Sequence, residues 1–160
     1  MPRGSGFVFR HYHLDPGPRR TRFEALARLA RSRGHVVALS DTPRTARQWR
    51  ADAVVGPPLR VEGAAGLLRF ATVHDFRELG EAVRAGADAA FLSPIFATRT
   101  HPDKATLGPV RALTMARHSP IPIVALGGMD AARARLLSPL HGWAAIDGLS
   151  TDCGRVPARD

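Results

Sequence analysis

The chain contains little cysteine, few aromatic residues and no long apolar run. One cysteine among 160 residues excludes an internal disulfide and is typical of a reducing compartment, so a cytoplasmic protein is expected. No apolar segment approaches the roughly 18 residues of a membrane span, and the chain does not open with the charged and then apolar pattern of a signal peptide. These absences predict that no membrane is among the partners.

Acidic residues are also few, with 14 Asp and Glu against 23 Lys and Arg, which gives a formal net charge of +9. The excess is almost wholly arginine, and it is scattered over the expected helix faces. It is explained either by a solvated arginine-rich surface or by a surface that steers phosphorylated substrates. Because aromatic residues make up only 6% of the chain and no recognition motif is present, no nucleic acid partner is expected.

Short apolar runs alternate with amphipathic patterns. Apolar runs without internal alternation suit strands covered on both faces, as in a parallel sheet. The helical patterns cover Arg22–Arg33, Asp75–Val83, Val110–Arg117 and Asp130–Leu137. The buried stripes expected on the first three are Phe23, Leu26, Ala27 and Ala30; Phe76, Leu79 and Val83; and Val110 and Leu113. Such alternation predicts βαβ units.

Two helix starts carry capping signals. Asp75 and Glu78 have the spacing of a capping box. Asp130 stands where an N-cap is expected, and Pro139 marks the end of the helix that follows.

Two apolar runs end in segments suited to ligand binding. Ala89–Leu92 is followed by a polar loop that reaches Asp103 and carries hydroxyls, an imidazole and charges. Loops after such strands hold ligands in α/β proteins. Ile121–Leu126 is followed by Gly127, Gly128, Met129 and Asp130 before a helical pattern, which leaves bare backbone amides in position to cradle a phosphate.

These two segments, in this order, resemble the thiamine phosphate synthase family, including its thiazole tautomerase relatives. The resemblance extends over roughly residues 5 to 150 and implies an α/β fold of the TIM (β/α)8-barrel type in a single domain spanning 1–160, with 151–160 as a tail. The apolar runs that match family strands two to eight are Phe7–Arg10, Val36–Asp41, Ala51–Gly56, Leu68–His74, Ala89–Leu92, Ile121–Leu126 and Gly142–Leu149.

A chain of 160 residues is short for such a barrel, which needs at least about 200. The family's first strand and helix and its closing helix have no counterpart, so an incomplete barrel of seven strands is expected. Open strand edges invite pairing with another chain, which makes a homo-oligomer a possible partner arrangement. Three explanations remain open: a translation start upstream of Met1, a truncated remnant, or a seam closed by a rearranged or dimeric contact.

The resemblance implies a function in thiamine biosynthesis: a transferase that joins hydroxymethylpyrimidine diphosphate to thiazole phosphate and releases diphosphate. Such a site needs cations and hydroxyls for the diphosphate, carboxylates that hold Mg²⁺ against it, and backbone amides for the thiazole's phosphate. Catalysis is then mainly positioning and neutralisation of the leaving group.

For the diphosphate, Arg10 coincides with the arginine of the family pattern Gln-Leu-Arg-Glu-Lys. Val8 replaces the glutamine and Tyr12 replaces the lysine, which removes one amide and one positive charge. His11 and His13 can partly restore the lost charge only if they are protonated. A structural ion pair is the alternative role of Arg10.

The loop after the family's sixth strand supplies further candidates. Thr98 and Thr100 fall on the family's paired threonines, His101 replaces the lysine that follows, and Lys104 restores that charge. The alternative is that the two hydroxyls only shape a turn.

For the metal, Asp41 matches the first family carboxylate, with Ser40 in place of the usual asparagine. The second carboxylate is missing, since the next loop reads Gly56, Pro57 and Pro58. Mg²⁺ can be held by one carboxylate together with substrate phosphates and water, so a weakened magnesium site is expected. Alternatively, Asp41 caps the following helix.

For the thiazole phosphate, Gly127 and Gly128 match the family, with a tight turn as the alternative. Thr72 takes the place of a family serine, and His74 occupies the histidine position of its Ser-X-His pattern or else caps the next helix. Asp147 stands where the family commonly has serine, next to Gly148, and an ionised carboxylate there opposes a phosphate.

The tautomerase branch fits less well, because its catalytic histidine falls on Pro94 and proline carries no titratable proton. Two functional classes remain: a synthase, weakly or fully active, and a catalytically degenerate member that binds a phosphorylated ligand.

Overall fold

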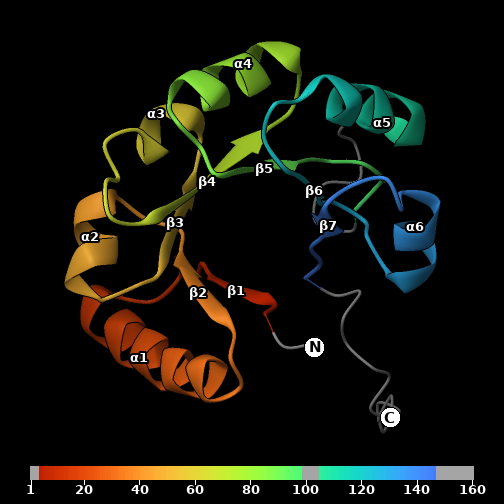
Figure 1. Cartoon of the computed structure of the whole chain (residues 1–160). Coiled ribbons are helices and arrows are strands. Elements are labelled where there is room, and N and C mark those ends of the chain that lie inside the picture. Colours follow the sequence, from red (N-terminus) through yellow and green to blue (C-terminus); the bar gives the residue numbers. More distant parts are fainter. Residues whose placement is uncertain (1–3, 99–104, 147–160) are drawn as a thin grey trace, which may run out of the picture. The chain divides into compact units, whose positions relative to one another are not determined.

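The computed structural model describes residues 4–98 and 105–146, which alternate strands with helices (Figure 1). The chain divides into two compact units, Met1–Ala90 and Phe91–Asp160. The strand pairs whose register is described are parallel, and neighbouring strands of the sheet follow one another in chain order. The predicted α/β alternation and the seven strands are therefore confirmed.

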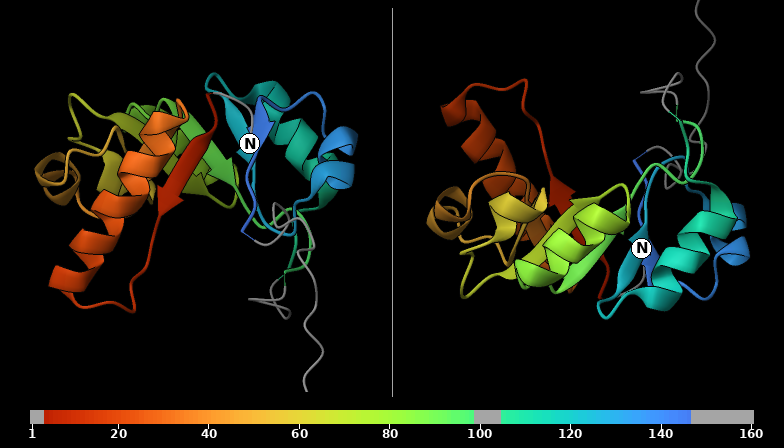
Figure 2. Two further views of the ribbon diagram at one scale, coloured as in Figure 1. Left: turned by 90° about the horizontal axis from the view of Figure 1, so that it is seen from below. Right: turned by 90° about the horizontal axis from the view of Figure 1, so that it is seen from above.

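The first unit holds four strands with a helix after each. Its elements are β1 (Gly6–Phe9), α1 (Pro16–Ser32), β2 (Val36–Leu39), α2 (Pro43–Gln48), β3 (Ala53–Gly56), α3 (Pro58–Val61), β4 (Leu68–Val73) and α4 (Phe76–Arg84). In Figures 1 and 2 these helices lie along one side of the strands, with α1 beside β1. Phe9 pairs with Leu39 across β1 and β2, so the residues that follow these strands share one edge.

The strand β5 (Ala89–Leu92) contains the boundary between the units, and the second unit continues with α5 (Gly108–His118), β6 (Ile123–Ala125), α6 (Ala131–Leu136) and β7 (Gly142–Trp143). Val124 of β6 pairs with Gly142 of β7, and the Leu126 N–H donates to the Leu92 carbonyl at 2.9 Å. The predicted last strand is therefore shorter than expected within the described residues, and its end beyond residue 146 lies outside them.

The core of the first unit forms where α1 packs on the sheet. Phe23, Ala27 and Ala30 are buried as predicted. The ring of Phe23 meets that of Phe9 edge-on, with centroids 5.4 Å apart, and both side chains are fully buried. Burial of two such rings stabilises this contact by about 2 kcal/mol per side chain, and it fixes α1 against β1.

Helix boundaries differ from the prediction mostly at prolines. The helix α1 begins at Pro16 rather than Arg22, while α2 and α3, which were not predicted, begin at Pro43 and Pro58. Proline suits a first helical position, because its φ is already helical and the N–H it lacks would be unpaired there. In this chain proline therefore marks helix starts.

Both predicted caps are confirmed. Asp75 accepts a hydrogen bond from the Glu78 N–H at 2.8 Å, and Asp130 accepts one from the Arg133 N–H at 2.8 Å. These bonds satisfy amides that the first helical turn leaves without partners.

The predicted buried faces of α4 and α5 are wrong in part. In α4, Leu79 is buried as expected, but Phe76 is 46% exposed and Ala82 is the second buried residue. In α5, Val110 is 80% exposed, and the buried residues are Ala112 and Met115. In both helices a small or flexible side chain lies on the buried face where a larger one was expected.

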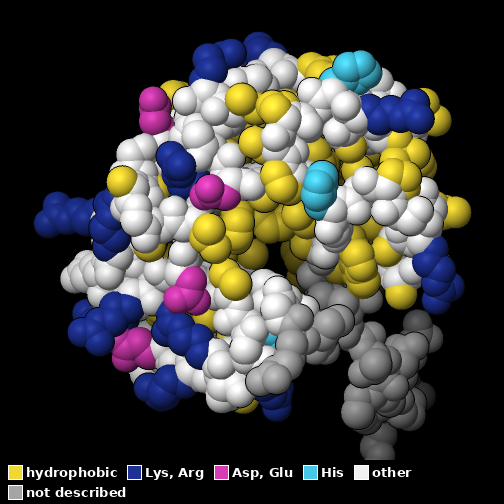
Figure 3. Space-filling view, viewed as in Figure 1, with side chains coloured by type: hydrophobic (Ala, Val, Ile, Leu, Met, Phe, Trp, Pro, Cys, Tyr) yellow, Lys and Arg dark blue, Asp and Glu magenta, His cyan; other side chains and the backbone are white. Residues whose placement is uncertain are grey.

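Positive side chains are dispersed on the face that Figure 3 shows. Lys and Arg lie around its edge, with Asp and Glu among them. None of the described helices is long and apolar enough to cross a membrane.

Candidate functional site

Arg10, Ser40 and Asp41 follow β1 and β2 at their C-terminal ends. The Arg10 side chain is exposed, and its guanidinium lies over the Tyr12 ring, 5.5 Å from the centroid. Within the described residues no carboxylate pairs with it. The ion-pair role considered for Arg10 is therefore absent from this part of the chain, and contact with a ligand stays a prediction.

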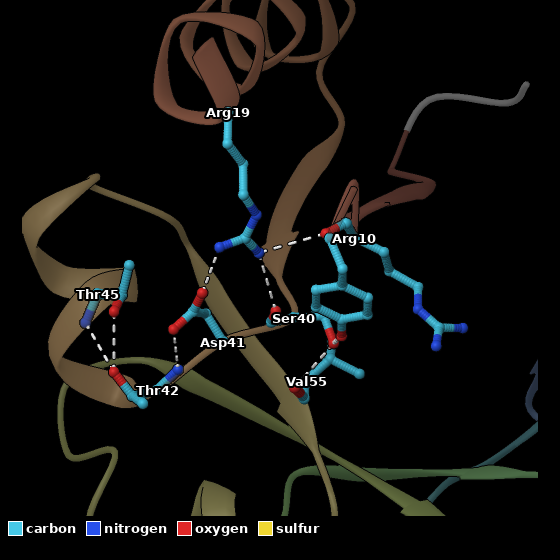
Figure 4. Close-up of polar contacts among 8 residues, drawn as sticks. Arg10, Arg19, Ser40, Asp41, Thr42, Thr45 and Val55 are labelled. Atoms are coloured by element: carbon cyan, nitrogen blue, oxygen red, sulfur yellow. Dashed lines mark hydrogen bonds and ion pairs between the residues drawn. The ribbon is translucent and has the colours of Figure 1, made fainter. Parts of the chain in front are cut away.

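Asp41 is engaged by an arginine that the sequence did not single out. Arg19, in the first turns of α1, donates from Nη1 to Asp41 Oδ2 at 2.5 Å, and the Thr42 N–H donates to Asp41 Oδ1 at 2.7 Å (Figure 4). The two side chains of the pair are only 12% and 22% exposed. Burial raises the pKa of Asp41, but the hydrogen bonds from Arg19 and Thr42 outweigh it and hold the pKa below its ordinary value.

Arg19 is fixed from several sides. Its Nη2 donates to the carbonyl oxygens of Arg10 and Ser40, each at 3.3 Å. Its guanidinium carbon also lies 5.3 Å from the Trp49 ring centroid and 5.5 Å from that of Tyr12. Cation–π contacts of this kind strengthen when the cation is desolvated. Arg19 thus joins the ends of β1 and β2 to α1.

Asp41 is not the helix cap considered above. Thr42 takes that role, since its Oγ1 accepts from the Thr45 N–H at 3.1 Å. Asp41, one residue earlier, turns its carboxylate to Arg19 (Figure 4).

His11 is poorly suited to replace the positive charge that is lost where Tyr12 stands in place of the family lysine. Burial, followed by the nearby charges of His13, Arg22 and Arg19, lowers the pKa of His11. Its ring is instead stacked on Phe9, with centroids 4.6 Å apart. The lowered pKa makes this imidazole less able to carry a positive charge near neutral pH.

The residues around Asp41 do not fit a resident Mg²⁺. Both carboxylate oxygens already accept hydrogen bonds, and a guanidinium lies where a dication would have to approach. Pro58, at the place of the second family carboxylate, begins α3. Among the described residues no group of three or more His, Cys, Asp or Glu could hold a metal.

A groove opens beside the Arg19–Asp41 pair. Its volume is about 580 Å³, and its lining includes Tyr12, Leu14, Arg19, Asp41 and Trp49. The groove combines aromatic faces with a neutralised ion pair, which suits a ring-shaped organic group more than a bare cation.

Thr72 and His74 lie at the C-terminal end of β4. Thr72 is half-buried, as its place in the strand requires. His74 is engaged at the start of α4: its backbone N–H and its Nδ1 both approach Glu78 Oε2, at 2.9 and 2.8 Å. The alternative that His74 caps α4 is therefore wrong, because Asp75 is the N-cap residue; ligand binding by His74 stays a prediction.

In the second unit, Gly127 and Gly128 form the turn after β6. Both have left-handed backbone, with φ of 92° and 62°. A Cβ on Gly127 would lie 2.7 Å from Pro94 Cα, and one on Gly128 would lie 2.5 Å from the Ala97 carbonyl oxygen. Only glycine fits here, because the loop after β5 passes directly against this turn.

The backbone amides of this turn have no acceptor among the described residues. Within the described residues, the N–H groups of Gly127, Gly128 and Met129 donate to no acceptor. Successive free amides in such a turn form an anion-binding nest. Arg133, missed from the sequence, lies over the Phe96 ring at 4.9 Å and donates to the Gly128 carbonyl.

The other predicted site residues are placed only in part. Thr98 is half-buried in the connection after β5. Thr100, His101, Lys104, Asp147 and Gly148 lie outside the described residues, so their roles stay predictions.

Known proteins resemble most of the chain. The family model for thiamine monophosphate synthase matches residues 4–149. The chain belongs to this family. A thiamine-phosphate synthase of Chloroflexus aurantiacus is 46% identical over 66 residues, and one of Thermosynechococcus vestitus is 43% identical over 54 residues. These matches cover 39% and 34% of the chain but only 30% and 15% of the relatives, so the chain matches a minor part of either protein.

Solved structures agree on the fold. The thiamine phosphate pyrophosphorylase from Pyrococcus furiosus matches with a TM-score of 0.77 at 24% identity, over 89% of this chain and 72% of that one. FabK from Thermotoga maritima matches with a TM-score of 0.66 at 18% identity, over 86% and 48%. The predicted fold, an incomplete TIM-barrel-like α/β fold, is thereby confirmed.

Proposed function

We propose that this member of the thiamine monophosphate synthase family is a transferase that joins hydroxymethylpyrimidine diphosphate to thiazole phosphate and releases diphosphate. The observation that carries the proposal is Arg10: it stands at the family's arginine, follows β1, is exposed, and pairs with no carboxylate among the described residues. A guanidinium in this state can take a diphosphate oxygen in each arm of its fork.

Arg10 and the predicted Thr98 and Thr100 bind the diphosphate in this proposal. Negative charge accumulates on the diphosphate as it leaves, and fixed cations and hydroxyls stabilise it more in the transition state than in the substrate. His101 and Lys104 are added to these diphosphate-binding residues because they lie in the segment that matches the family's loop after strand six.

The thiazole phosphate is bound by the turn of Gly127 and Gly128. The support is its left-handed backbone and its free amides. Thr72 and Gly148 contribute through the family match, whereas Asp147 has to turn away from the phosphate or be protonated.

A second function is favoured by the Arg19–Asp41 pair. Since Asp41 is already neutralised by a hydrogen-bonded cation, the chain can have kept a phosphorylated ligand while losing synthesis. This catalytically degenerate binder predicts ligand affinity without product.

The test is formation of thiamine phosphate from the two purified substrates, followed by chromatography. Arg10→Ala should lower the rate about 100-fold, the loss typical for one transition-state donor. Arg44→Ala, which removes another exposed arginine in α2, is the matched control and should leave the rate unchanged. Equal rates for Arg10→Ala and the parent would remove Arg10 from the site, and ligand binding without product would favour the degenerate binder.

A further inference from the structure

The guanidinium of Arg19 lies beside Asp41, where the Mg²⁺ ion was expected. Arg19 Nη1 lies 2.5 Å from Asp41 Oδ2, and its side chain is only 12% exposed. Its charge is permanent, because guanidinium does not deprotonate in proteins. A carboxylate in this state has one compensating charge and little remaining attraction for a dication.

Arg19 is held too firmly to give way easily to a metal. To free Asp41, the guanidinium would have to break its bonds to the Arg10 and Ser40 carbonyls and leave the faces of Tyr12 and Trp49. The Nε atom is buried and has no hydrogen-bond partner among the described residues, so only the two terminal nitrogens of Arg19 hold it in place by hydrogen bonds. Displacement would therefore cost several interactions at once.

We propose that Arg19 takes the place of the divalent cation, so that this chain binds its phosphorylated ligand without Mg²⁺. The inference rests on the proposed function and names a positioning residue for it. Arg19 neutralises Asp41, which would otherwise repel a diphosphate at the same strand ends. Through the Arg10 carbonyl it also holds the segment that presents the Arg10 guanidinium (Figure 4).

The missing second carboxylate fits this account. Mg²⁺ is usually bound by one or two carboxylates plus substrate phosphates. Here the first carboxylate is paired and the second position is Pro58, so both changes remove metal affinity together. An arginine supplies positive charge without the carboxylate ligands that a bound Mg²⁺ requires.

The experiment is titration calorimetry with inorganic diphosphate, in EDTA and in excess Mg²⁺, on the full chain. For the parent protein the two Kd values should agree within about twofold. Arg19→Gln frees Asp41 and should make binding dependent on Mg²⁺, with a Kd at least tenfold tighter in Mg²⁺ than in EDTA. The double variant Arg19→Gln, Asp41→Asn removes both charges, and its Kd should no longer depend on Mg²⁺. Circular dichroism checks that each variant is folded.

A purely structural role of Arg19 would change stability but not metal dependence. If diphosphate binds the parent protein only in Mg²⁺, and Asp41→Asn abolishes the effect, the inference is overturned while the proposed function stands. If Arg19→Gln stays folded and binds diphosphate without regard to Mg²⁺, Arg19 is not a substitute for the cation, and the inference is again overturned. Absence of diphosphate binding under every condition would overturn the proposed function itself, and this inference with it.

Discussion

The hydroxyl oxygen of Tyr12 lies 2.5 Å from Ser40 Oγ. Each residue departs from the family pattern, in which lysine and asparagine are usual at these positions. Ser40 is only 6% exposed, and Tyr12 reaches it from the segment after β1. Two departures that look like separate losses in the sequence therefore contact each other.

This contact predicts coupled stability effects. Tyr12→Phe and Ser40→Ala should each lower the free energy of unfolding by about 1 kcal/mol, the usual net value of one hydrogen bond. In a double-mutant cycle measured by urea unfolding, the second change should cost much less once the first is made. Strict additivity would show that the two hydroxyls do not interact in solution.

The Arg19–Asp41 pair predicts a stability difference that depends on pH. The folded-state pKa of Asp41 is lowered, so its stabilisation is complete above the unfolded-state pKa of about 4 and is lost as the pH falls through the folded-state value. Asp41→Asn should cost about 2 kcal/mol at pH 7, and the difference from the parent should shrink below pH 4.

Asp15→Asn is the control for that series, because Asp15 flanks α1 without a side-chain capping bond and should cost little at either pH. A constant penalty for Asp41→Asn from pH 7 to pH 3 would contradict the ion pair.

The turn after β6 predicts that two glycines respond differently to alanine. Gly128 and Gly108 have similar positive φ values, 62° and 72°, but only Gly128 has backbone within 3 Å of a Cβ position. Gly108→Ala should therefore show the conformational cost alone, about 1 kcal/mol. Gly128→Ala should cost at least about 1 kcal/mol more, measured by thermal unfolding. Equal penalties would mean that the loop after β5 does not pack against this turn.

The features predicted correctly from the sequence are mostly local. Asp75 and Asp130 cap helices within three residues of themselves, and each predicted apolar run overlaps a strand. The start of α1 at Pro16 was not predicted, because this proline lies more than one helical turn before Phe23, the first residue of the buried stripe.

Arg19 and Arg133 could not be found in the same way. Each lies in an arginine-rich helical segment in which neighbouring arginines are solvated, and nothing in its own segment distinguishes it. Their roles arise from residues distant in sequence, Asp41 for Arg19 and Phe96 for Arg133. Only the fold brings these groups together.

The edge of β1 predicts self-association. Within the described residues β1 is hydrogen-bonded to β2 alone, and Gly6 on that strand is exposed. An unpaired strand edge can pair with another chain, so light scattering should find dimers or larger species at micromolar concentration. Val8→Lys should reduce these species, because charge on an edge strand opposes pairing. A monodisperse monomer at all concentrations would show that the edge is covered.

The proposed transferase activity is tested most directly by following both products of the reaction. Phosphorus-31 NMR on hydroxymethylpyrimidine diphosphate, thiazole phosphate and the protein in EDTA follows both products at once. Thiamine phosphate and inorganic diphosphate should accumulate in equal amounts without added metal, and Arg10→Ala should slow the formation of both about 100-fold. No product from the folded protein, in EDTA or in Mg²⁺, would contradict the proposed activity.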